Sequence, residues 1–396
     1  MTDLPMGSHG VAPRERLHSL DAYRGWVMFF LAAGELGISA ALLVNFFPDS
    51  FFLQALAAQS THVRWAGCHA WDMIQPSFMF IVGVSLAYSY RSRQGRGQGF
   101  RRMFGHAVYR AIVLVLLGVF LRSGHGTQTH WTFEDVLTQI GLGYVFLFLL
   151  WDRGWKMQAG AAAAILVGYW ALWRFWPQIA PLFGAANPVA GWHEAAQPGW
   201  PAEGNPGQAF DLWLRNLLPH EHAFTNWPYY TLNFIPSLAT MIFGLMAGHL
   251  LQSDKSNERK VLTLLGAGAA GIVLGYALDW SGACPIVKKI WTPSWTLFSG
   301  GWCLLLLGEM FWIVDVWRWR RWAFPAVVLG MNSIGVYVLV HYWHGWLPKV
   351  LSIHLDYWLL ELVSPAWATL IRTLLAFALL WLVFFWMYRR RIFLRI

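Results

Sequence analysis

Two histidines and an aspartate lie close together in one stretch of the chain, STHVRWAGCHAWDMIQPSFMFIVG, which covers residues 60–83. His62 and His69 come from its polar first half, and Asp72 stands where the apolar second half begins. An imidazole titrates near neutrality, so it can take up or release a proton, and a carboxylate can hold its second nitrogen. The stretch therefore favours proton-transfer or nucleophilic chemistry at His62, with His69 as a structural or interfacial residue.

The composition of the chain describes the elements that must position these groups. Hydrophobic residues make up 57% of the sequence and charged residues 12%, and the mean hydropathy is +0.42. These values are typical of a polytopic membrane protein. Apolar runs of about 20 residues, enough to cross a bilayer, predict an all-α fold with about ten transmembrane helices. The runs cover residues 25–47, 72–90, 107–121, 136–151, 157–176, 229–251, 261–280, 295–317, 325–346 and 367–388.

Lys and Arg residues gather in every second loop and at both ends of the chain, as in RSRQGRGQGFRR and RRRIFLRI. Cytoplasmic loops hold such a positive excess, so we expect both termini in the cytoplasm. Topology thus explains the net charge of +9, and binding to nucleic acid is not expected.

A simple domain organisation follows from the spans. We expect a cytoplasmic N-terminal segment over residues 1–24, one membrane domain over 25–388, and a basic cytoplasmic tail over 389–396. Within the domain, residues 177–228 form a long outward-facing connection rich in Pro, Gly and Trp, which favours an ordered lid or substrate loop. Gly271 and Gly275 lie one turn apart in GAGAAGIVLG, a spacing that indicates close helix packing.

Ionisable side chains inside the spans are the next candidates for function. Each costs about 2.5 to 3.5 kcal/mol at the centre of a membrane helix, so it needs a partner or a task. Buried ion pairs that fix helix packing are the alternative for all of them. The candidates are Glu35, Asp72, Arg110, Glu309 and Arg372.

Several motifs, in order, resemble the heparan-alpha-glucosaminide N-acetyltransferase family over nearly the whole chain. The opening RLHSLDAYRG is followed by HVRWAGCHAWDMIQPSFMFIVG. Then come VLTQIGLGY, NFIPSLATMIFGLMAG, KKIWTPSW, GMNSIGVYVLVH and the terminal RRRIFLRI. The resemblance implies an enzyme that takes an acetyl group from cytoplasmic acetyl-CoA and delivers it to the amine of a glucosamine on the far side of the membrane.

The resemblance also suggests roles for single residues. His62 matches the histidine implicated in acetyl transfer, and Asp72 matches the acid that opens the second span. Glu35 replaces an asparagine of the animal enzyme, and Gln139 replaces an arginine. Asp21 and Arg24 match the motif at the start of the first span, Lys288 and Trp291 match a K-x-x-W pattern, and Asn332 matches the GMNS motif. We expect Asp21 and Arg24 to bind acetyl-CoA. The residues expected at the substrate are Lys288, Trp291, Asn332 and His341.

Transfer of an acetyl group to an amine explains why these residue types are needed. A protonated amine must lose a proton before or during attack on a thioester, so His62 acts as base, or it carries the acetyl group itself. Glu35 or Asp72 would orient its ring. Lys288 would contact the substrate or the developing oxyanion. Arg24, Arg101 and Arg102 are the candidates for the phosphates of acetyl-CoA, although positive-inside charge also explains the last two.

Other classes of protein remain in view. A transporter or flippase for a small polar or sugar-containing solute would share the helices and buried charges, but it favours inverted repeats, which we do not find. A metalloenzyme using His341 and His344 with His62 or Asp72 is a weaker alternative. We expect a bacterial inner membrane as the setting, a homodimer as the candidate assembly, and no disulfide framework, although Cys68 and Cys284 could pair.

Overall fold

The computed structural model describes residues 17–124, 126–183, 200, 204–219 and 229–394. Residues 1–16 of the N-terminal segment, much of the 177–228 connection and residues 395–396 of the tail lie outside that range. Every regular element in the described part is helical, apart from one isolated antiparallel bridge between Ala66 and Val287. An all-helical fold is therefore confirmed.

The α-helices follow one another along the chain with short 3-10 turns at several of their ends. The first eight are α1 (His18–Glu35), α2 (Ala40–Val44), α3 (Phe51–Gln59), α4 (Ile74–Gly95), α5 (Phe100–Arg122), α6 (Val136–Leu150), α7 (Trp155–Arg174) and α8 (Trp176–Ile179). The others are α9 (Pro206–Asn216), α10 (Phe234–Gln252), α11 (Asn257–Trp280), α12 (Pro293–Met310), α13 (Phe324–Gly330), α14 (Ser333–Leu362) and α15 (Pro365–Arg389).

Six of the described helical segments are long and apolar enough to cross a membrane, and the count rises to seven if a pair bent by 71° is one span. The expected count of about ten is not confirmed. Two of the expected spans show why: the first helix ends at Glu35, well before residue 47, and α6 has only 15 residues. The six segments are Ala70–Gly95, Phe100–Arg122, Thr231–Gln252, Asn257–Trp280, Pro293–Val316 and Pro365–Arg389, and the bent pair is Arg321–Gly330 with Ser333–Leu362.

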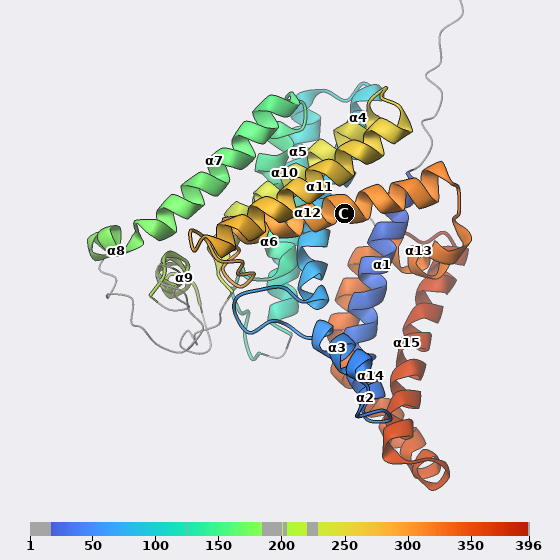
Figure 1. Cartoon of the computed structure of the whole chain (residues 1–396). Helices are drawn as coiled ribbons and strands as arrows, with labels where there is room; N and C mark the ends of the chain where they lie inside the picture. The colour runs from blue at the N-terminus through green and yellow to red at the C-terminus, as the bar shows by residue number, and fades with distance from the viewer. Residues whose placement is uncertain (1–16, 125, 184–199, 201–203, 220–228, 395–396) are drawn as a thin grey trace, which may run out of the picture.

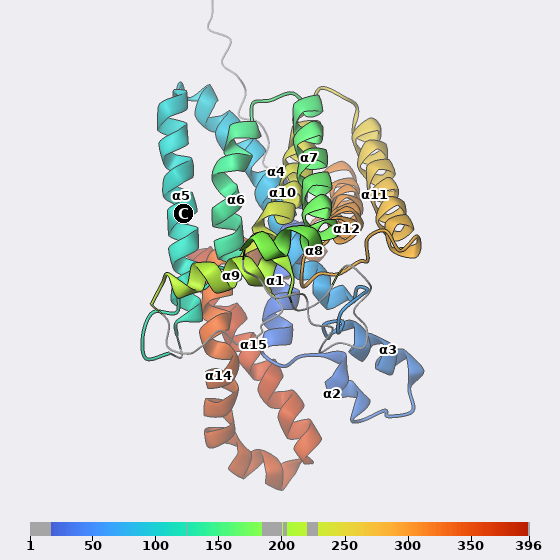
Figure 2. The same cartoon turned by 90° about the vertical axis from the view of Figure 1, so that its left-hand side faces the viewer.

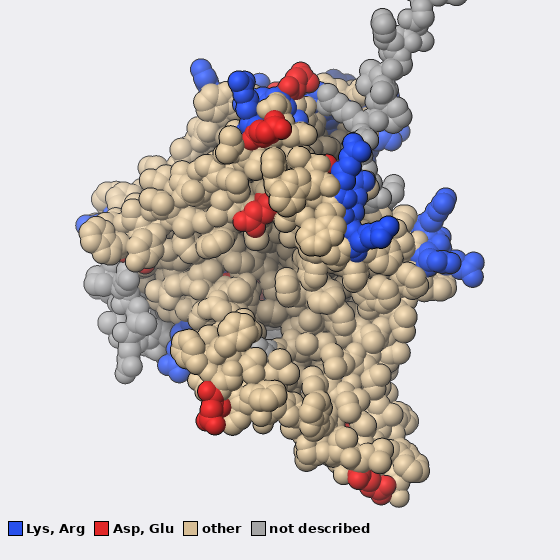
Figure 3. Space-filling model, turned by 45° about the vertical axis from the view of Figure 1, so that its right-hand side comes forward, with Lys and Arg blue, Asp and Glu red and all other residues tan. Residues whose placement is uncertain are grey.

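The helices from α4 to α7 and from α10 to α12 lie side by side, and the loops α4–α5, α6–α7 and α10–α11 meet at one end of this bundle (Figures 1 and 2). On the face drawn in Figure 3, most Lys and Arg side chains gather toward that same upper end. Helices α14 and α15 form a hairpin that extends beyond the opposite end. This polarity agrees with the distribution of charge in the loops of the sequence.

Glycines allow the central helices to approach at backbone distance. A Cβ atom added at Gly83 of α4 would lie 1.9 Å from the carbonyl oxygen of Met241 in α10, and one added at Gly244 would lie 1.9 Å from the oxygen of Phe80. Helices α11 and α12 cross in the same way, since a Cβ at Gly275 would lie 2.7 Å from the oxygen of Ser294. The close packing predicted from the glycines of α11 is confirmed.

The contact between α4 and α10 gives a testable consequence for stability. We expect Gly83→Ala to destabilise the fold by about 1–3 kcal/mol or more, because the added methyl group meets backbone that cannot yield. Thermal unfolding in detergent would measure the effect. Gly95→Ala is the matched control in the same helix, since no atom lies within 4 Å of its added Cβ. Equal stability of both variants would contradict this account of the helix crossing.

The start of α1 is fixed by a carboxylate from a distant helix. Asp315 accepts hydrogen bonds from the backbone N–H groups of His18 (3.2 Å) and Ser19 (2.9 Å), which are otherwise without partners at a helix N-terminus. About two turns later, Gly25 packs against α13, where its added Cβ would lie 2.4 Å from Ala326. These contacts hold Asp21 and Arg24 beside the first residues of α14.

Candidate active site

The Asp72 side chain organises the loop that leads into α4. Its Oδ1 accepts a hydrogen bond from Nδ1 of His62 at 2.6 Å. Its Oδ2 accepts from the backbone N–H groups of Val63 (3.2 Å) and His69 (3.1 Å). Asp72 lies in the short 3-10 turn Ala70–Met73 and its side chain is 1% exposed. A buried carboxylate with these partners fixes both the loop and the imidazole ring.

The contact with Asp72 assigns the proton on the imidazole ring of His62. Because an ionised carboxylate only accepts hydrogen bonds, Nδ1 of His62 carries the hydrogen, and the lone pair is on Nε2. The His62 side chain is 47% exposed, whereas Asp72 beneath it is buried. This arrangement leaves Nε2 available as a base or nucleophile toward a molecule bound outside.

Lys288 reaches the same carboxylate from a loop more than 200 residues away in sequence. The bridge between Ala66 and Val287, with a hydrogen bond from N–H of Gly67 to the oxygen of Ile286 (2.8 Å), aligns the two loops. Nζ of Lys288 then lies 3.3 Å from Oδ1 of Asp72 and 3.3 Å from Nδ1 of His62. His62, Asp72 and Lys288, which we call the His62 triad, are thus brought together. The sequence had paired His62 with Glu35 or Asp72 and had placed Lys288 at the substrate or the developing oxyanion.

Lys288 lies behind the histidine and is not open to solvent. Its side chain is 5% exposed, and burial lowers its pKa below the ordinary value of lysine, while the Asp72 carboxylate acts in the opposite direction. Since Nδ1 of His62 already donates to Asp72, the Lys288 ammonium donates to the carboxylate. Lys288 therefore holds the same oxygen of Asp72 from a position beside the imidazole.

We expect Lys288→Met to keep the fold and to reduce the rate of the reaction at His62 by up to about 100-fold, because Asp72 would lose one of the groups that position it.

The same Lys288→Met variant allows a second test, in which the free energy of unfolding is measured as a function of pH. The native protein carries the burial penalty of the ammonium only below the lowered pKa of Lys288. The stability of the variant relative to the native protein should therefore fall as pH rises from neutral toward about 10.4, the ordinary lysine value. Chemical unfolding at several pH values would measure this trend, and an opposite trend would contradict the assignment.

Cys68 is the other nucleophilic group next to the triad. Burial, reinforced by the nearby Asp72 carboxylate, raises the pKa of Cys68 to about 12. A cysteine attacks as a thiolate, so this thiol is a poor nucleophile at neutral pH. Cys68 and Cys284 are both free thiols here. Cys68 is therefore a weaker candidate nucleophile than the exposed imidazole of His62.

Trp71 and the end of α1 form one side of the site. The Trp71 ring lies against Gly34, where an added Cβ would be 2.0 Å from the ring, and its centroid is 6.4 Å from that of His62. The next residue of α1, Glu35, is exposed. Its side chain makes no hydrogen bond or ion pair with any other described residue. Asp72, and not Glu35, is the acid that holds His62.

Three other predicted site residues lie elsewhere. Trp291 is fully buried and has a left-handed φ of 47°. Its backbone N–H donates to the carbonyl oxygen of Lys288 at 2.9 Å. Trp291 thus shapes the turn that presents Lys288. Asn332 is buried at the start of α14 and contacts the C-terminal tail. His341 donates from Nε2 to the oxygen of Leu121 at 3.1 Å.

His341 is in the first third of α14 and lies near the C-terminal end of α5, where a second polar network forms. Asp135 accepts hydrogen bonds from Arg122 and from the Tyr337 hydroxyl, both at 3.1 Å. In the part of the chain that the structure describes, no group of three or more His, Cys, Asp or Glu side chains is arranged to hold a metal ion. The metal site that sequence suggested at His341 and His344 does not form there.

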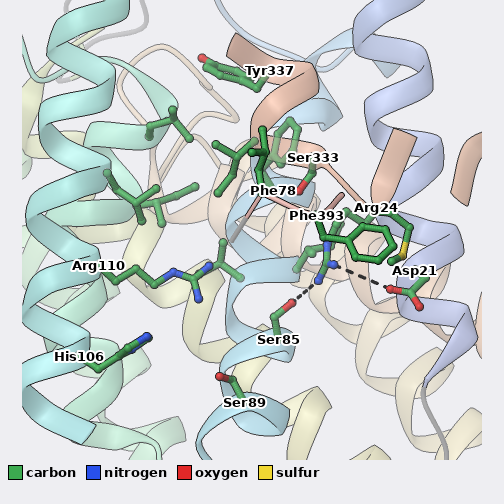
Figure 4. Close-up of a pocket in the computed structure, with 18 of the residues that line it drawn as sticks. Asp21, Arg24, Phe78, Ser85, Ser89, His106, Arg110, Ser333, Tyr337 and Phe393 are labelled. Carbon is green, nitrogen blue, oxygen red and sulfur yellow. Dashed lines mark hydrogen bonds and ion pairs between the residues drawn. The ribbon is translucent and has the colours of Figure 1, made fainter. Parts of the chain in front are cut away.

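A cavity of about 860 Å³ opens between α1, α4, α5, α6 and α14 (Figure 4). One end of its lining is apolar, with Phe78, Leu114, Val136 and Tyr337 among the residues. The other end carries four arginines and one acid, together with three serines of α4 at helical spacing. The arginines are Arg24, Arg93, Arg96 and Arg110, the acid is Asp21, and the serines are Ser85, Ser89 and Ser92.

Two arginines show how the guanidinium groups of the cavity are held. Arg24 donates to Oγ of Ser85 at 2.6 Å and lies 3.9 Å from Asp21. The guanidinium of Arg110 stands over the Tyr144 ring at 5.0 Å, and its buried Nε bonds no other described residue. Such a group of guanidinium donors is suited to phosphate oxygens.

Two residues of the basic end, Asp21 and Arg24, were predicted from the sequence, and most of the others were not. The expected contacts Arg101 and Arg102 are exposed in the first turn of α5 and do not line the cavity. The sequence contains a pattern that could have indicated the other residues of the basic end. Ser85, Ser89 and Ser92 share one face of a membrane helix that ends in arginines.

The architecture and site define an all-helical protein with membrane-spanning helices and an exposed, carboxylate-held histidine. Comparison of sequences is more specific. The chain is 24% identical to mouse heparan-alpha-glucosaminide N-acetyltransferase over 366 residues, which cover 82% of this chain and 53% of that protein. It is 23% identical to the human protein of the same name over 424 residues, which cover 96% of this chain and 60% of the other. No family model matches the chain.

The similarity to heparan-alpha-glucosaminide N-acetyltransferase is weak in identity and consistent along most of the chain, as the motifs predicted. The chain spans between half and about 60% of the length of these relatives. Homology to a transmembrane N-acetyltransferase supports a transferase and does not favour the transporter.

Proposed function

We propose that this protein is a transmembrane acetyltransferase that moves an acetyl group from acetyl-CoA to the amine of a glucosamine-like amino sugar. The observation that carries the proposal is the pairing of two features along α4. The His62 triad lies at its first turn, and the basic end of the cavity lies at its last turns. Similarity to two N-acetyltransferases supports the same chemistry.

Acetyl-CoA has phosphates at one end and a thioester at the other, and the cavity has matching ends. Arg24, Arg93 and Arg110 would bind the phosphates, and the apolar part near Phe78 would take the uncharged arm. Arg93 and Asp72 are separated by about 30 Å along the helix axis, close to the thickness of the hydrocarbon core. Phe78 lies only about 9 Å along α4 from Asp72, so we infer that the thioester passes Phe78 to reach His62.

In direct transfer from acetyl-CoA to the amine, each step moves a proton to or from a defined atom. The acceptor ammonium first releases one proton to solvent. Nε2 of His62 then removes a second proton from the attacking nitrogen as this nitrogen forms a bond to the thioester carbonyl carbon. The carbon–sulfur bond then breaks, and His62 returns the proton to the sulfur of CoA. Asp72 stabilises the charged imidazole meanwhile, and Lys288 keeps the carboxylate in place.

A second route uses the same geometry. Nε2 of His62 attacks the thioester itself, the carbon–sulfur bond breaks, and CoA leaves as a thiolate that takes a proton from solvent. The free amine then attacks the acetyl-imidazolium, the neutral imidazole leaves, and the nitrogen releases its extra proton to solvent. The two routes differ in a measurement without acceptor. Only the acyl-histidine route exchanges label between acetyl-CoA and free CoA under that condition, so exchange identifies it and its absence identifies direct transfer.

The sidedness of the reaction follows from the charge rule. Basic loops at the Arg93 end would face the cytoplasm, where acetyl-CoA is available, and His62 would face the outside. We propose the bacterial inner membrane as the setting, one membrane domain over residues 25–388, and a homodimer as the assembly.

Transfer of labelled acetyl groups by the purified protein in liposomes tests the proposal. Labelled acetyl-CoA is supplied with glucosamine or another amino sugar, and the product is separated by chromatography. We expect labelled N-acetyl sugar from the native protein and only background from protein-free liposomes. Uptake of the sugar without acetylation would favour the transporter, and absence of both acetyl-CoA binding and product would overturn the proposal.

A further inference from the structure

The C-terminal tail folds back onto the basic end of the cavity. Helix α15 ends at Arg389, and Arg391 has a left-handed φ of 57°, which reverses the direction of the chain. The N–H of Ile392 bonds the carbonyl of Met387 at 2.9 Å and completes this turn. Residues 392–394, which we call the tail strap, then run beside the start of α14.

Asn332 binds the backbone of the tail strap with both halves of its amide group. Its Nδ2 donates to the oxygen of Ile392 at 3.0 Å, and its Oδ1 accepts from the N–H of Leu394 at 2.8 Å. Asn332 is completely buried. Leu394 also packs on Gly335, where an added Cβ would be 2.9 Å from Leu394 Cδ1. With both polar groups of its side chain engaged in this way, Asn332 is placed to hold the tail and not to bind a substrate directly.

Phe393 lies between the two residues that Asn332 holds, and it lines the cavity. In Figure 4 its ring lies beside Arg24 and near Ser333, at the basic end. Phe393 is thus an aromatic surface next to guanidinium groups, an environment suited to a nucleotide with a flat base and phosphates.

We propose that Phe393 is a donor-binding residue that contacts the nucleotide end of acetyl-CoA, and that Asn332 is a positioning residue that acts through it. The inference rests on the proposed function, because it assigns a ligand to the same cavity. A purely structural tail would affect only the stability of the fold. Under this proposal, the contact of Asn332 with Ile392 and Leu394 also affects the affinity for CoA.

Binding of CoA to the full-length protein tests the inference without any turnover. We expect Phe393→Ala to raise the dissociation constant for CoA about tenfold, as for loss of one aromatic stacking partner. Asn332→Ala should raise the dissociation constant for CoA by a similar factor. Because Asn332 acts through Phe393, the double variant should bind CoA as tightly as Phe393→Ala alone. Ile392→Ala is the matched control, because it keeps the carbonyl that Asn332 binds and removes a side chain that does not line the cavity.

Steady-state kinetics adds a second readout. The KM for acetyl-CoA should rise in Phe393→Ala and Asn332→Ala, whereas the KM for the amino sugar should stay constant, since the acceptor approaches at His62. An unchanged dissociation constant for CoA in folded Phe393→Ala would overturn the inference. Additive effects in the double variant, or equal changes in both KM values, would also overturn it.

A labelling experiment separates this inference from the proposed function. Ser89 lines the same cavity, so Ser89→Cys can be modified by a charged thiol reagent, with the native cysteines as background. We expect faster modification when Phe393→Ala or Asn332→Ala is added, and no change with Ile392→Ala. If these variants are modified faster but the native protein binds no CoA, the proposed function is overturned. In that case the tail strap still forms a wall of the cavity. Unchanged modification together with unchanged CoA affinity would overturn the inference alone.

Discussion

The His62→Ala variant is expected to lose acetyl transfer by a factor of about 10² to 10⁴, the range that a positioned proton-transfer group contributes. The exposed Nε2 of His62 is the basic atom of the triad that is open to a substrate, since Asp72 and Lys288 are buried beneath it. The alanine side chain removes this atom and leaves the fold intact, because the ring is half-exposed. Transfer from labelled acetyl-CoA to glucosamine at saturating substrate would measure the loss.

His69→Ala is the matched control for this prediction. His69 belongs to the same loop, but its ring contacts the backbone oxygen of Thr61 at 3.0 Å, and its tie to Asp72 is made by the backbone N–H, which alanine keeps. We expect near-native transfer from His69→Ala and unchanged CoA binding in both variants. A native rate from His62→Ala, or the same loss from His69→Ala, would show that the reacting base lies elsewhere.

The triad was accessible to sequence analysis to different degrees. His62 and Asp72 are ten residues apart at the start of a membrane helix, so residue type and position alone pointed to them. Lys288 was identified through the motif that contains it, but its partner was not, because the bridge between Ala66 and Val287 is a long-range pairing without a local pattern. Glu35 illustrates the same limit, since the sequence offered two acids and only the fold brings Asp72 to the ring.

The cavity and the membrane spans were harder to predict. Arg93 and Arg110 look like topogenic or packing charges in sequence, and only the arrangement of five helix regions places them in one wall. The tail strap depends on a left-handed residue, Arg391, after the last helix, which residue type does not indicate. The count of about ten spans is not confirmed, and apolar composition does not mark where a helix ends, as at Glu35.

Asp72→Asn is expected to reduce transfer by about 10³ to 10⁴ while acetyl-CoA still binds, comparable to the loss when an orienting aspartate becomes an amide in a catalytic triad. The physical reason is the tautomer of His62. Oδ2 of Asp72 accepts from two backbone N–H groups, so the single oxygen of an asparagine would be held there. Its NH₂ group would then face Nδ1 of His62 and donate to it.

With that donor in place, the proton of the imidazole moves to Nε2, and the lone pair that should face the substrate is lost. Lys288 would also lose its carboxylate and face an amide donor, so the variant combines a wrong tautomer with an unpaired buried ammonium. Asp72→Glu is the control, because it keeps a carboxylate and should retain more transfer than Asp72→Asn. If Asp72→Asn binds CoA normally and transfers at near the native rate, Asp72 fixes only the loop, and the base at His62 needs no orienting acid.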